Sequence, residues 1–205
     1  MRPAFLRRDP LRRPAPARRQ PHRLAIWLAG ALLALTVCEA VLAQPVQRKV
    51  SLEYAVKATY LYKLAPFVNW PPTTFTSQSA PFNICVAGED PFDNFLQKAV
   101  AGRSYGQHPF VVRRLASLEP DENCQIVFIG HMRRRDVREA LAAIEGEPVL
   151  TVTDSSAGSA PGSIMQFVIV DGHVRFKIDT AAAARNHLSI SSKLLSLAVS
   201  VSEEG

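Results

Sequence analysis

The sequence predicts an α/β protein: a three-layer sandwich with a mostly parallel sheet and an antiparallel hairpin at one edge. Two observations predict this class. Short segments that are almost entirely apolar, as strands covered on both faces should be, alternate with segments that carry helical periodicity or helix-capping residues. Near the C-terminus, two strand-like segments flank Asp171 and Gly172, a dipeptide typical of two-residue hairpin turns.

The first helix of this pattern is predicted to begin near residue 52. Apolar residues recur there at spacings of four, four, four and three: Leu52, Val56, Tyr60, Leu64 and Phe67. This spacing predicts that they form one buried helical face. We expect the helix to end near Trp70, because Pro71 and Pro72 follow and proline lacks the backbone donor that a helix needs.

The remaining elements alternate along the chain. Strands are predicted over residues 82–87, 109–114, 124–129, 148–152, 164–170 and 173–178. Helices are predicted over residues 91–100, 133–144, 180–185 and 193–199. Asp90 and Asp179 are the expected N-caps of the first and third of these helices. Residues 155–162 are almost wholly Ser, Ala, Gly and Pro, which predicts a loop.

The N-terminal segment has the three parts of a secretory signal peptide. An Arg- and Pro-rich start precedes an apolar run over residues 24–37, and Val41 and Ala43 are the small residues before a cleavage site at Gln44. The apolar run is too short for a stable transmembrane helix, which needs about 20 residues. We therefore expect export to the periplasm with cleavage near Ala43.

The predicted organisation is a signal peptide over residues 1–43 and a single domain over residues 44–205, a length that suffices for one domain with a real core. Two other export routes are left open. The pairs Arg12-Arg13 and Arg18-Arg19 are compatible with export by the twin-arginine route, and residues 35–38 are compatible with a lipoprotein cleavage site. Neither feature lies in a fuller motif.

The positive charge of the chain is concentrated in the leader. Eight of the 24 Lys and Arg residues and two of the 18 acidic residues precede Gln44, which leaves 16 of each sign after it. A mature domain without net charge lacks the basic stripe that binding to phosphate backbones needs, so no nucleic-acid partner is expected.

The predicted compartment determines which state of the cysteines is expected. Cys38 lies in the leader, so the mature chain keeps Cys85 and Cys124. In an oxidising space a disulfide between them is favoured over two buried free thiols, and it would close a loop of about 39 residues worth roughly 4 kcal/mol. No metal site is expected, because two cysteines without nearby histidines make a poor ligand set.

No catalytic or cofactor motif is found, and we expect neither an enzyme nor a cofactor. Residues 88–91 follow a strand as a nucleotide-binding turn would, but they lack G-x-G-x-x-G and carry two carboxylates. Residues 158–162 favour a flexible loop over a nucleophile elbow. The mature chain's histidines are scattered singly, at His108, His131, His173 and His187. The run Arg133-Arg134-Arg135 is more typical of a solvated helix start than of a binding patch.

Two groups of residues are candidates for partner or ligand binding. Aromatic residues gather on and beside the first predicted helix, where they serve either the core or a partner surface: Tyr60, Tyr62, Phe67 and Trp70. Ser191, Ser192 and Lys193 open the last predicted helix, where backbone amides, the helix dipole and a lysine could hold an anion or a small ligand, the alternative being plain helix capping.

The chain resembles the YfiR family of periplasmic proteins through most of its mature part. The resemblance is carried by blocks in the same order: KATYLY over residues 57–62, FVNWP over 67–71, ICV over 84–86, Gly88, DPF over 90–92, CQIVFI over 124–129, PVLTVTD over 148–154, VRF over 174–176 and LSISSKLL over 188–195. Several blocks in the right order are far more specific than any one of them.

The resemblance implies a regulator rather than a catalyst. The predicted fold is Rossmann-like without a dinucleotide fingerprint, and the resemblance implies that this small α/β domain binds the periplasmic sensor part of a membrane-anchored diguanylate cyclase and lowers cyclic-di-GMP output. It also implies an outer-membrane lipoprotein and a second copy of the chain as further partners. Cys85 and Cys124 fall where the family has a disulfide pair, whereas the second pair of some members is missing. The alternative from another class is a periplasmic small-molecule receptor acting on another membrane partner.

Overall fold

The computed structural model describes residues 52–154 and 162–203, all of which belong to the compact unit Gln47–Gly205. The predicted signal peptide over residues 1–43 and nearly all of the predicted loop over residues 155–162 lie outside the described residues.

The described residues form a main sheet of eight strands in the order β10-β8-β7-β6-β5-β2-β4-β3. These strands are β2 (Phe82–Ala87), β3 (Ser104–Tyr105), β4 (His108–Leu115), β5 (Ile126–Ile129), β6 (Leu150–Asp154), β7 (Met165–Val170), β8 (His173–Asp179) and β10 (Ser200–Ser202). The chain runs in parallel through β4, β2, β5, β6 and β7, and the pair β7 and β8 is antiparallel. The predicted α/β class and its mostly parallel sheet are thus confirmed.

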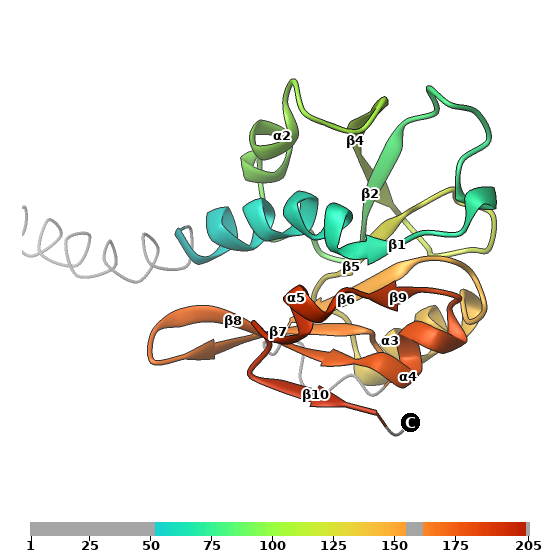
Figure 1. The fold of residues 1–205 in the computed structure, drawn as a ribbon. Helices are drawn as coiled ribbons and strands as arrows, with labels where there is room; N and C mark the ends of the chain where they lie inside the picture. Colours follow the sequence, from blue (N-terminus) through green and yellow to red (C-terminus); the bar gives the residue numbers. More distant parts are fainter. Residues whose placement is uncertain (1–51, 155–161, 204–205) are drawn as a thin grey trace, which may run out of the picture. The chain divides into compact units, whose positions relative to one another are not determined.

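The helices cover both faces of this sheet (Figure 1). They are the first helix (residues 52–64), α2 (Phe95–Val100), α3 (Arg134–Ala143), α4 (Thr180–Arg185) and α5 (Ser192–Leu195), with short 3-10 turns η1 (Ala65–Phe67) and η2 (Pro72–Thr74). Strand residues of alternate parity enter two separate cores. One core contains Ile84 and Phe128 and is closed by the first helix and α2. The other contains Cys85 and Val127 and is closed by α3.

The predicted hairpin is present, with β7 and β8 paired from Met165↔Ile178 to Val170↔His173. It lies one strand in from the edge of the sheet, because β10 adds in parallel to the outer side of β8. The expected last helix over residues 193–199 is correspondingly too long. The helix ends at Leu195, and the amide of Val199 donates to the carbonyl of Phe176 on β8 instead, which starts the added strand.

The prediction for the first helix is wrong in two respects. The helix ends at residue 64 rather than near Trp70, because Pro66 lacks the amide that a continuing helix would direct back to Tyr62. Its buried stripe also differs from the predicted one. Leu52 is 66% exposed and Val56 38%, whereas the fully buried positions are Lys57, Ala58, Leu61, Leu64 and Ala65.

A second, two-stranded sheet joins the end of the first helix to the C-terminal part of the chain. β1 (Val68–Asn69) pairs antiparallel with β9 (Ser189–Ile190), and the side-chain amide of Asn69 donates to the hydroxyl of Ser189 over 2.9 Å. Figure 1 shows these two strands side by side. This small sheet brings residues 67–70 next to residues 189–193, two stretches that the sequence analysis singled out separately.

The two predicted aspartate caps behave differently. Asp179 caps α4 as predicted, with its Oδ1 accepting the amide of Ala182 over 2.7 Å. Asp90 accepts the amide of Phe92 over 2.8 Å, which makes a local turn rather than a helix start. The following helix, α2, begins only at Phe95 after Asn94.

Candidate functional site

The disulfide between Cys85 and Cys124 joins β2 to the segment that leads into its neighbour β5. Cys85 lies within β2, and Cys124, 39 positions further along the chain, lies just before β5; their Cα atoms are 5.9 Å apart. Both side chains are buried. The bond is therefore placed to stabilise the fold and is shielded from solvent.

The carboxyl ends of β2 and β5 mark the place where open α/β sheets usually bind ligands, because the chain leaves these two strands in opposite directions. Here the two following loops are joined by backbone contacts. The amide of Gly130 donates to the carbonyl of Ala87 over 2.8 Å, and Glu89 forms an antiparallel bridge with His131. A Cβ atom on Gly130 would lie 1.9 Å from the carbonyl oxygen of Glu89. Protein backbone thus occupies this crevice.

The residues after β2 also make contacts within the protein. Gly88 has φ +82°, and a Cβ atom there would lie 2.8 Å from the side chain of Met132. Asp90, besides holding the Phe92 amide, accepts from Nε of Arg114 over 2.6 Å. The turn therefore has neither the space nor the charge to hold a nucleotide phosphate.

A buried ion pair connects the first helix to the end of β6. Lys57 is 1% exposed, and its Nζ donates to Oδ2 of Asp154 over 2.5 Å and to Oε1 of Glu53 one helical turn earlier. The ammonium also lies 4.5 Å from the centroid of the Tyr54 ring. Burial by itself lowers the pKa of Lys57, but the hydrogen bonds and charges of Asp154 and Glu53 outweigh it and raise the pKa above 10.5.

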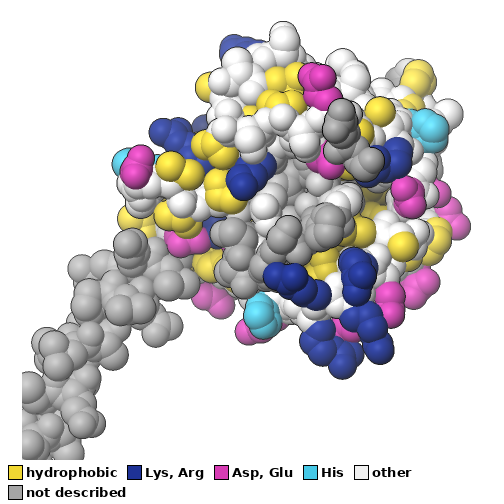
Figure 2. All heavy atoms as spheres, turned by 90° about the horizontal axis from the view of Figure 1, so that it is seen from below, with side chains coloured by type: hydrophobic (Ala, Val, Ile, Leu, Met, Phe, Trp, Pro, Cys, Tyr) yellow, Lys and Arg dark blue, Asp and Glu magenta, His cyan; other side chains and the backbone are white. Residues whose placement is uncertain are grey.

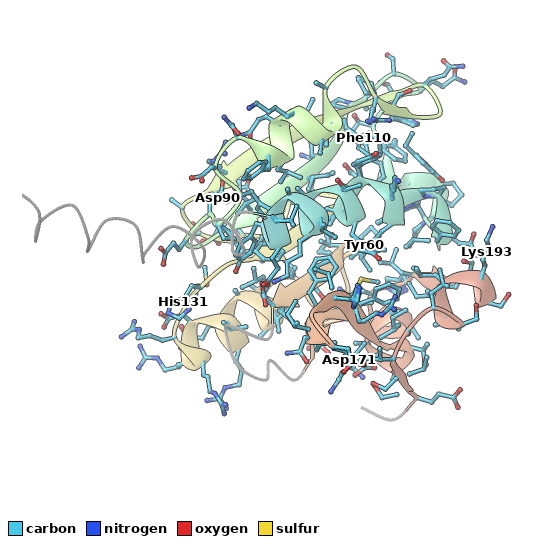
Figure 3. All side chains as sticks on the ribbon, turned by 90° about the vertical axis from the view of Figure 1, so that its left-hand side faces the viewer. Tyr60, Asp90, Phe110, His131, Asp171 and Lys193 are labelled. Atoms are coloured by element: carbon cyan, nitrogen blue, oxygen red, sulfur yellow. A yellow bond between two sulfur atoms is a disulfide. The ribbon has the colours of Figure 1, made fainter. Side chains whose placement is uncertain are left out.

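The aromatic candidates on the first helix lie in two different environments. The ring of Tyr60 packs on the rings of Phe167 and Phe176, with centroid distances of 6.0 and 6.1 Å. Tyr62 packs on Phe110, 6.0 Å away. In Figure 3, Tyr60 lies below the first helix and Phe110 lies above it. The two tyrosines therefore do not form one surface.

Phe67 and Trp70 are half-buried beyond the end of this helix. Nζ of Lys193 lies 5.9 Å from the centroid of the Phe67 ring. The Trp70 ring packs at right angles on Phe82, with centroids 5.4 Å apart, and its Nε1 donates to the carbonyl of Ala65 over 3.2 Å. The outer part of Trp70 borders a recess of about 640 Å³ next to β9.

The two serines at the start of α5 have distinct roles. The hydroxyl of Ser191 accepts the amide of Leu194 over 3.3 Å, so Ser191 caps a helix of only four residues. Ser192 and Lys193 are exposed, and Figure 3 shows Lys193 at the outer end of the molecule. The structure thus brings Phe67 and Lys193 together, whereas Tyr60 is separated from them.

A second recess, of about 680 Å³, was missed by the sequence analysis. It lies between the first helix and the turn that connects β3 to β4, and its lining includes Tyr62, Phe67, Arg103, Tyr105 and Phe110. The sequence contains a partial indication of this recess, because residues 102–106 are Gly-Arg-Ser-Tyr-Gly. A cation and an aromatic residue between two turn-forming glycines are typical of exposed side chains at a loop tip.

One histidine and two arginines outside these recesses make contacts within the fold. His108 stacks on Phe75 with ring centroids 3.7 Å apart. Arg133 pairs with Asp136 and Arg135 with Glu139 along α3. Within the described part of the chain, no group of three or more His, Cys, Asp or Glu side chains is arranged to hold a metal ion.

Several large apolar side chains are exposed to solvent. Those described as exposed are Leu52, Val56, Val111, Ile169, Val170, Leu197, Val199 and Val201. Figure 2 shows apolar side chains in several groups on one face, with Lys and Arg side chains gathered at its lower border. Apolar side chains exposed singly are common on protein surfaces, and only those that lie together form a surface typical of protein contacts.

Comparison with known families gives a specific match. A family model described as YfiR/HmsC-like matches residues 54–199, well over half of the chain. The chain belongs to the YfiR/HmsC-like family. No curated protein sequence matches it significantly.

Membership of the YfiR/HmsC-like family indicates a periplasmic regulator of cyclic-di-GMP signalling that acts with a membrane-associated partner. The family is regulatory rather than catalytic. Over residues 52–154 and 162–203, no helix combines the length and apolar character that crossing a membrane requires.

Proposed function

We propose that the mature chain, residues 44–205, binds the periplasmic sensor part of a membrane-anchored diguanylate cyclase and lowers its output of cyclic-di-GMP. The match to the YfiR/HmsC-like family over residues 54–199 carries this proposal. The predicted signal peptide over residues 1–43 would deliver the chain to the compartment where the sensor part lies.

The geometry of the described residues supports action through protein contact. The crevice where α/β enzymes bind nucleotides is filled by the bridge between Glu89 and His131. Several apolar side chains are also accessible to a partner, among them Leu52 at 66% and Leu197 at 59% exposed.

The proposed contacts with the cyclase include Phe67 and Lys193, whose aromatic and cationic groups lie together beside the small β1 and β9 sheet. Tyr62 and Trp70 are half-buried on either side of Phe67 in sequence and keep accessible edges at the two recesses. The other proposed contacts are Tyr60, Ser191 and Ser192. Aromatic and cationic side chains dominate the energetics of many protein interfaces.

The direct test is deletion of the gene and measurement of intracellular cyclic-di-GMP by mass spectrometry. We expect the level to rise and to return when the full chain is supplied from a plasmid. A matched control supplies residues 44–205 without the leader, which keeps the protein in the cytoplasm and should not restore the level. Intact-mass measurement of the periplasmic protein should give a chain that starts at Gln44. An unchanged cyclic-di-GMP level after deletion would contradict the proposal.

The partner is identified by cross-linking in intact cells and purification of the tagged protein from the membrane fraction. We expect a membrane diguanylate cyclase among the cross-linked proteins, and deletion of its gene should abolish the rise in cyclic-di-GMP. The same preparation would reveal an outer-membrane lipoprotein, and light scattering of the purified protein would show whether it is a homodimer. A receptor acting on another membrane protein would instead capture a partner without cyclase activity and leave cyclic-di-GMP unchanged.

A further inference from the structure

The recess between the first helix and the turn joining β3 to β4 has the dimensions and lining of a small-molecule site. Its volume of about 680 Å³ lies within the range of ligand pockets, roughly 300–1,000 Å³. The side chains that matter most are Tyr62, Lys63, Phe67, Arg103, Tyr105 and Phe110. They come from three separate parts of the chain that the fold brings together.

The aromatic walls of the recess are held in place by the core. The rings of Tyr105 and Phe110 pack on Phe82, with centroid distances of 5.5 and 5.0 Å, and Phe82 is fully buried. Phe110 also packs on Tyr62. The walls are therefore fixed before any ligand arrives, which reduces the entropy lost on binding.

The recess carries positive charge. Nε of Arg103 donates to the carbonyl of Ala99 over 2.9 Å, and the guanidinium lies 4.9 Å from the centroid of Tyr62. These two contacts hold the guanidinium at the rim. Lys63 adds a second exposed cation, and no Asp or Glu is among the described residues that line the recess.

Two glycines flank the segment that carries Arg103 and Tyr105. Gly102 and Gly106 have φ +68° and +58°, a conformation that favours glycine. At both positions the space where a Cβ atom would lie has no neighbour within 4 Å. The backbone amide of Phe110 donates to the carbonyl of Arg103 over 3.1 Å, which fixes the cation beside the aromatic wall.

From these observations we propose that the recess binds a small planar aromatic carboxylate. The rings of Tyr105 and Phe110 provide apolar faces and edges for a planar ring. The guanidinium of Arg103 provides donors that match a carboxylate, and Lys63 adds a second positive charge. A cationic ligand would be repelled, and a neutral one would leave the two cations without a counter-charge. The recess shares Tyr62 and Phe67 with the proposed contacts to the cyclase, but binding of the carboxylate does not depend on the cyclase.

The test uses 2-naphthoate as the probe, with the isosteric neutral amide 2-naphthamide as its control. Binding to the purified mature chain is measured by titration in 1H-15N NMR spectra. Ordinary ligand efficiency for a compound of this size predicts a dissociation constant on the order of 1 mM for 2-naphthoate. We expect the amide to bind about tenfold more weakly, since it lacks the charge-assisted hydrogen bonds. The largest chemical-shift changes should fall on residues 102–110.

Variants locate the site. Arg103→Gln should weaken 2-naphthoate binding about tenfold and remove most of the difference between acid and amide. Lys63→Gln should weaken it by a smaller factor, because Lys63 contributes charge alone. The matched control is Arg134→Gln, an exposed arginine of α3 on the other side of the sheet, which should bind as the wild type does. Melting temperatures of all variants establish that they are folded.

Three results would overturn the proposal: equal binding of acid and amide, chemical-shift changes centred outside residues 102–110, or no saturable binding of 2-naphthoate. Added salt is expected to weaken the binding of the acid while leaving the amide unaffected, because the attraction is between exposed charges. None of these measurements involves a cyclase, so failure here would leave the proposed inhibitory function standing. Conversely, an unchanged cyclic-di-GMP level in the deletion strain would not contradict the proposed carboxylate site.

Discussion

The ammonium group of Lys57 on the first helix lies 2.5 Å from the carboxylate of Asp154 at the end of β6, and both side chains are buried. The two residues are 97 positions apart in sequence. Their contact ties the helix that covers one face of the sheet to the strand that carries Asp154. A polar anchor of this kind fixes the helix at one position along the strands, which apolar packing alone does less precisely.

Removal of the lysine charge should destabilise the protein strongly. Lys57→Met keeps the volume of the side chain but leaves Asp154 buried without its cation, and loss of one partner of a buried pair costs about 3–5 kcal/mol. Lys63→Met, at an exposed position of the same helix, should change the free energy of unfolding by less than about 0.5 kcal/mol. Urea denaturation of both variants checks this. Equal stabilities of the two would show that the buried pair contributes little.

The same pair predicts a dependence of stability on alkaline pH. The pKa of Lys57 is raised above 10.5 in the folded protein, because the hydrogen bonds and charges of Asp154 and Glu53 outweigh the effect of burial. A group whose pKa is raised on folding contributes stability that is fully present below its unfolded pKa and is lost as the pH rises through its folded pKa. We therefore expect the stability difference between wild type and Lys57→Met to be constant from neutral pH to about pH 10 and to shrink above pH 10.5. A difference that grows with alkaline pH would contradict this.

The first helix shows why sequence patterns identified the element but not its buried face. The spacing of Leu52, Val56 and Tyr60 is correct for one side of a helix, yet the sheet covers the side that carries Lys57 and Leu61. A lysine counts as polar in any hydropathy pattern. Its burial depends on Asp154, which lies on a strand far away in sequence, and no residue pattern near Lys57 indicates this partner.

The strands of the central sheet were predictable because burial on both faces makes them continuous apolar runs, as in residues 126–129. The two-residue strands β1 and β9 exist only through their pairing with each other, so no local pattern marks them. The same holds for the candidate sites. Phe67 and Lys193 were each noticed alone, and the recess lined by Arg103 was not, since its walls come from separate segments.

The disulfide is expected to be a major source of stability. Replacing Cys85 and Cys124 together by alanine removes the cross-link and should lower the free energy of unfolding by about 2–5 kcal/mol. Trp70 is the one tryptophan after the leader, so its fluorescence in the mature chain follows unfolding in urea. Wild-type protein unfolded in the presence of a reductant should match the double variant. A loss of less than about 1 kcal/mol would mean that the loop is already constrained in the unfolded chain.

Because protein backbone fills the crevice between the loops after β2 and β5, alanine substitutions at two glycines should differ in their effect on stability. Gly130→Ala places a methyl group 1.9 Å from the carbonyl oxygen of Glu89, a backbone atom that cannot rotate away. We expect a loss of about 3 kcal/mol or more, or failure to fold. Gly146→Ala is the control, because its Cβ would have no neighbour within 4 Å and only the cost of φ +86° applies, about 1 kcal/mol. Similar melting temperatures for the two variants would show that the loops after β2 and β5 separate easily.

Charge reversal at Lys193 tests the proposed partner surface without disturbing the core. The side chain is exposed above the Phe67 ring, so Lys193→Glu should leave the free energy of unfolding within about 0.5 kcal/mol of wild type. If this region contacts the cyclase, the variant should bind more weakly, because charges at the border of an interface control association. In the deletion strain it should then fail to bring cyclic-di-GMP back to the wild-type level. Lys98→Glu, an exposed lysine of α2, is the matched control and should restore that level fully. Full restoration by both variants at equal periplasmic amounts would place the contact elsewhere on the domain.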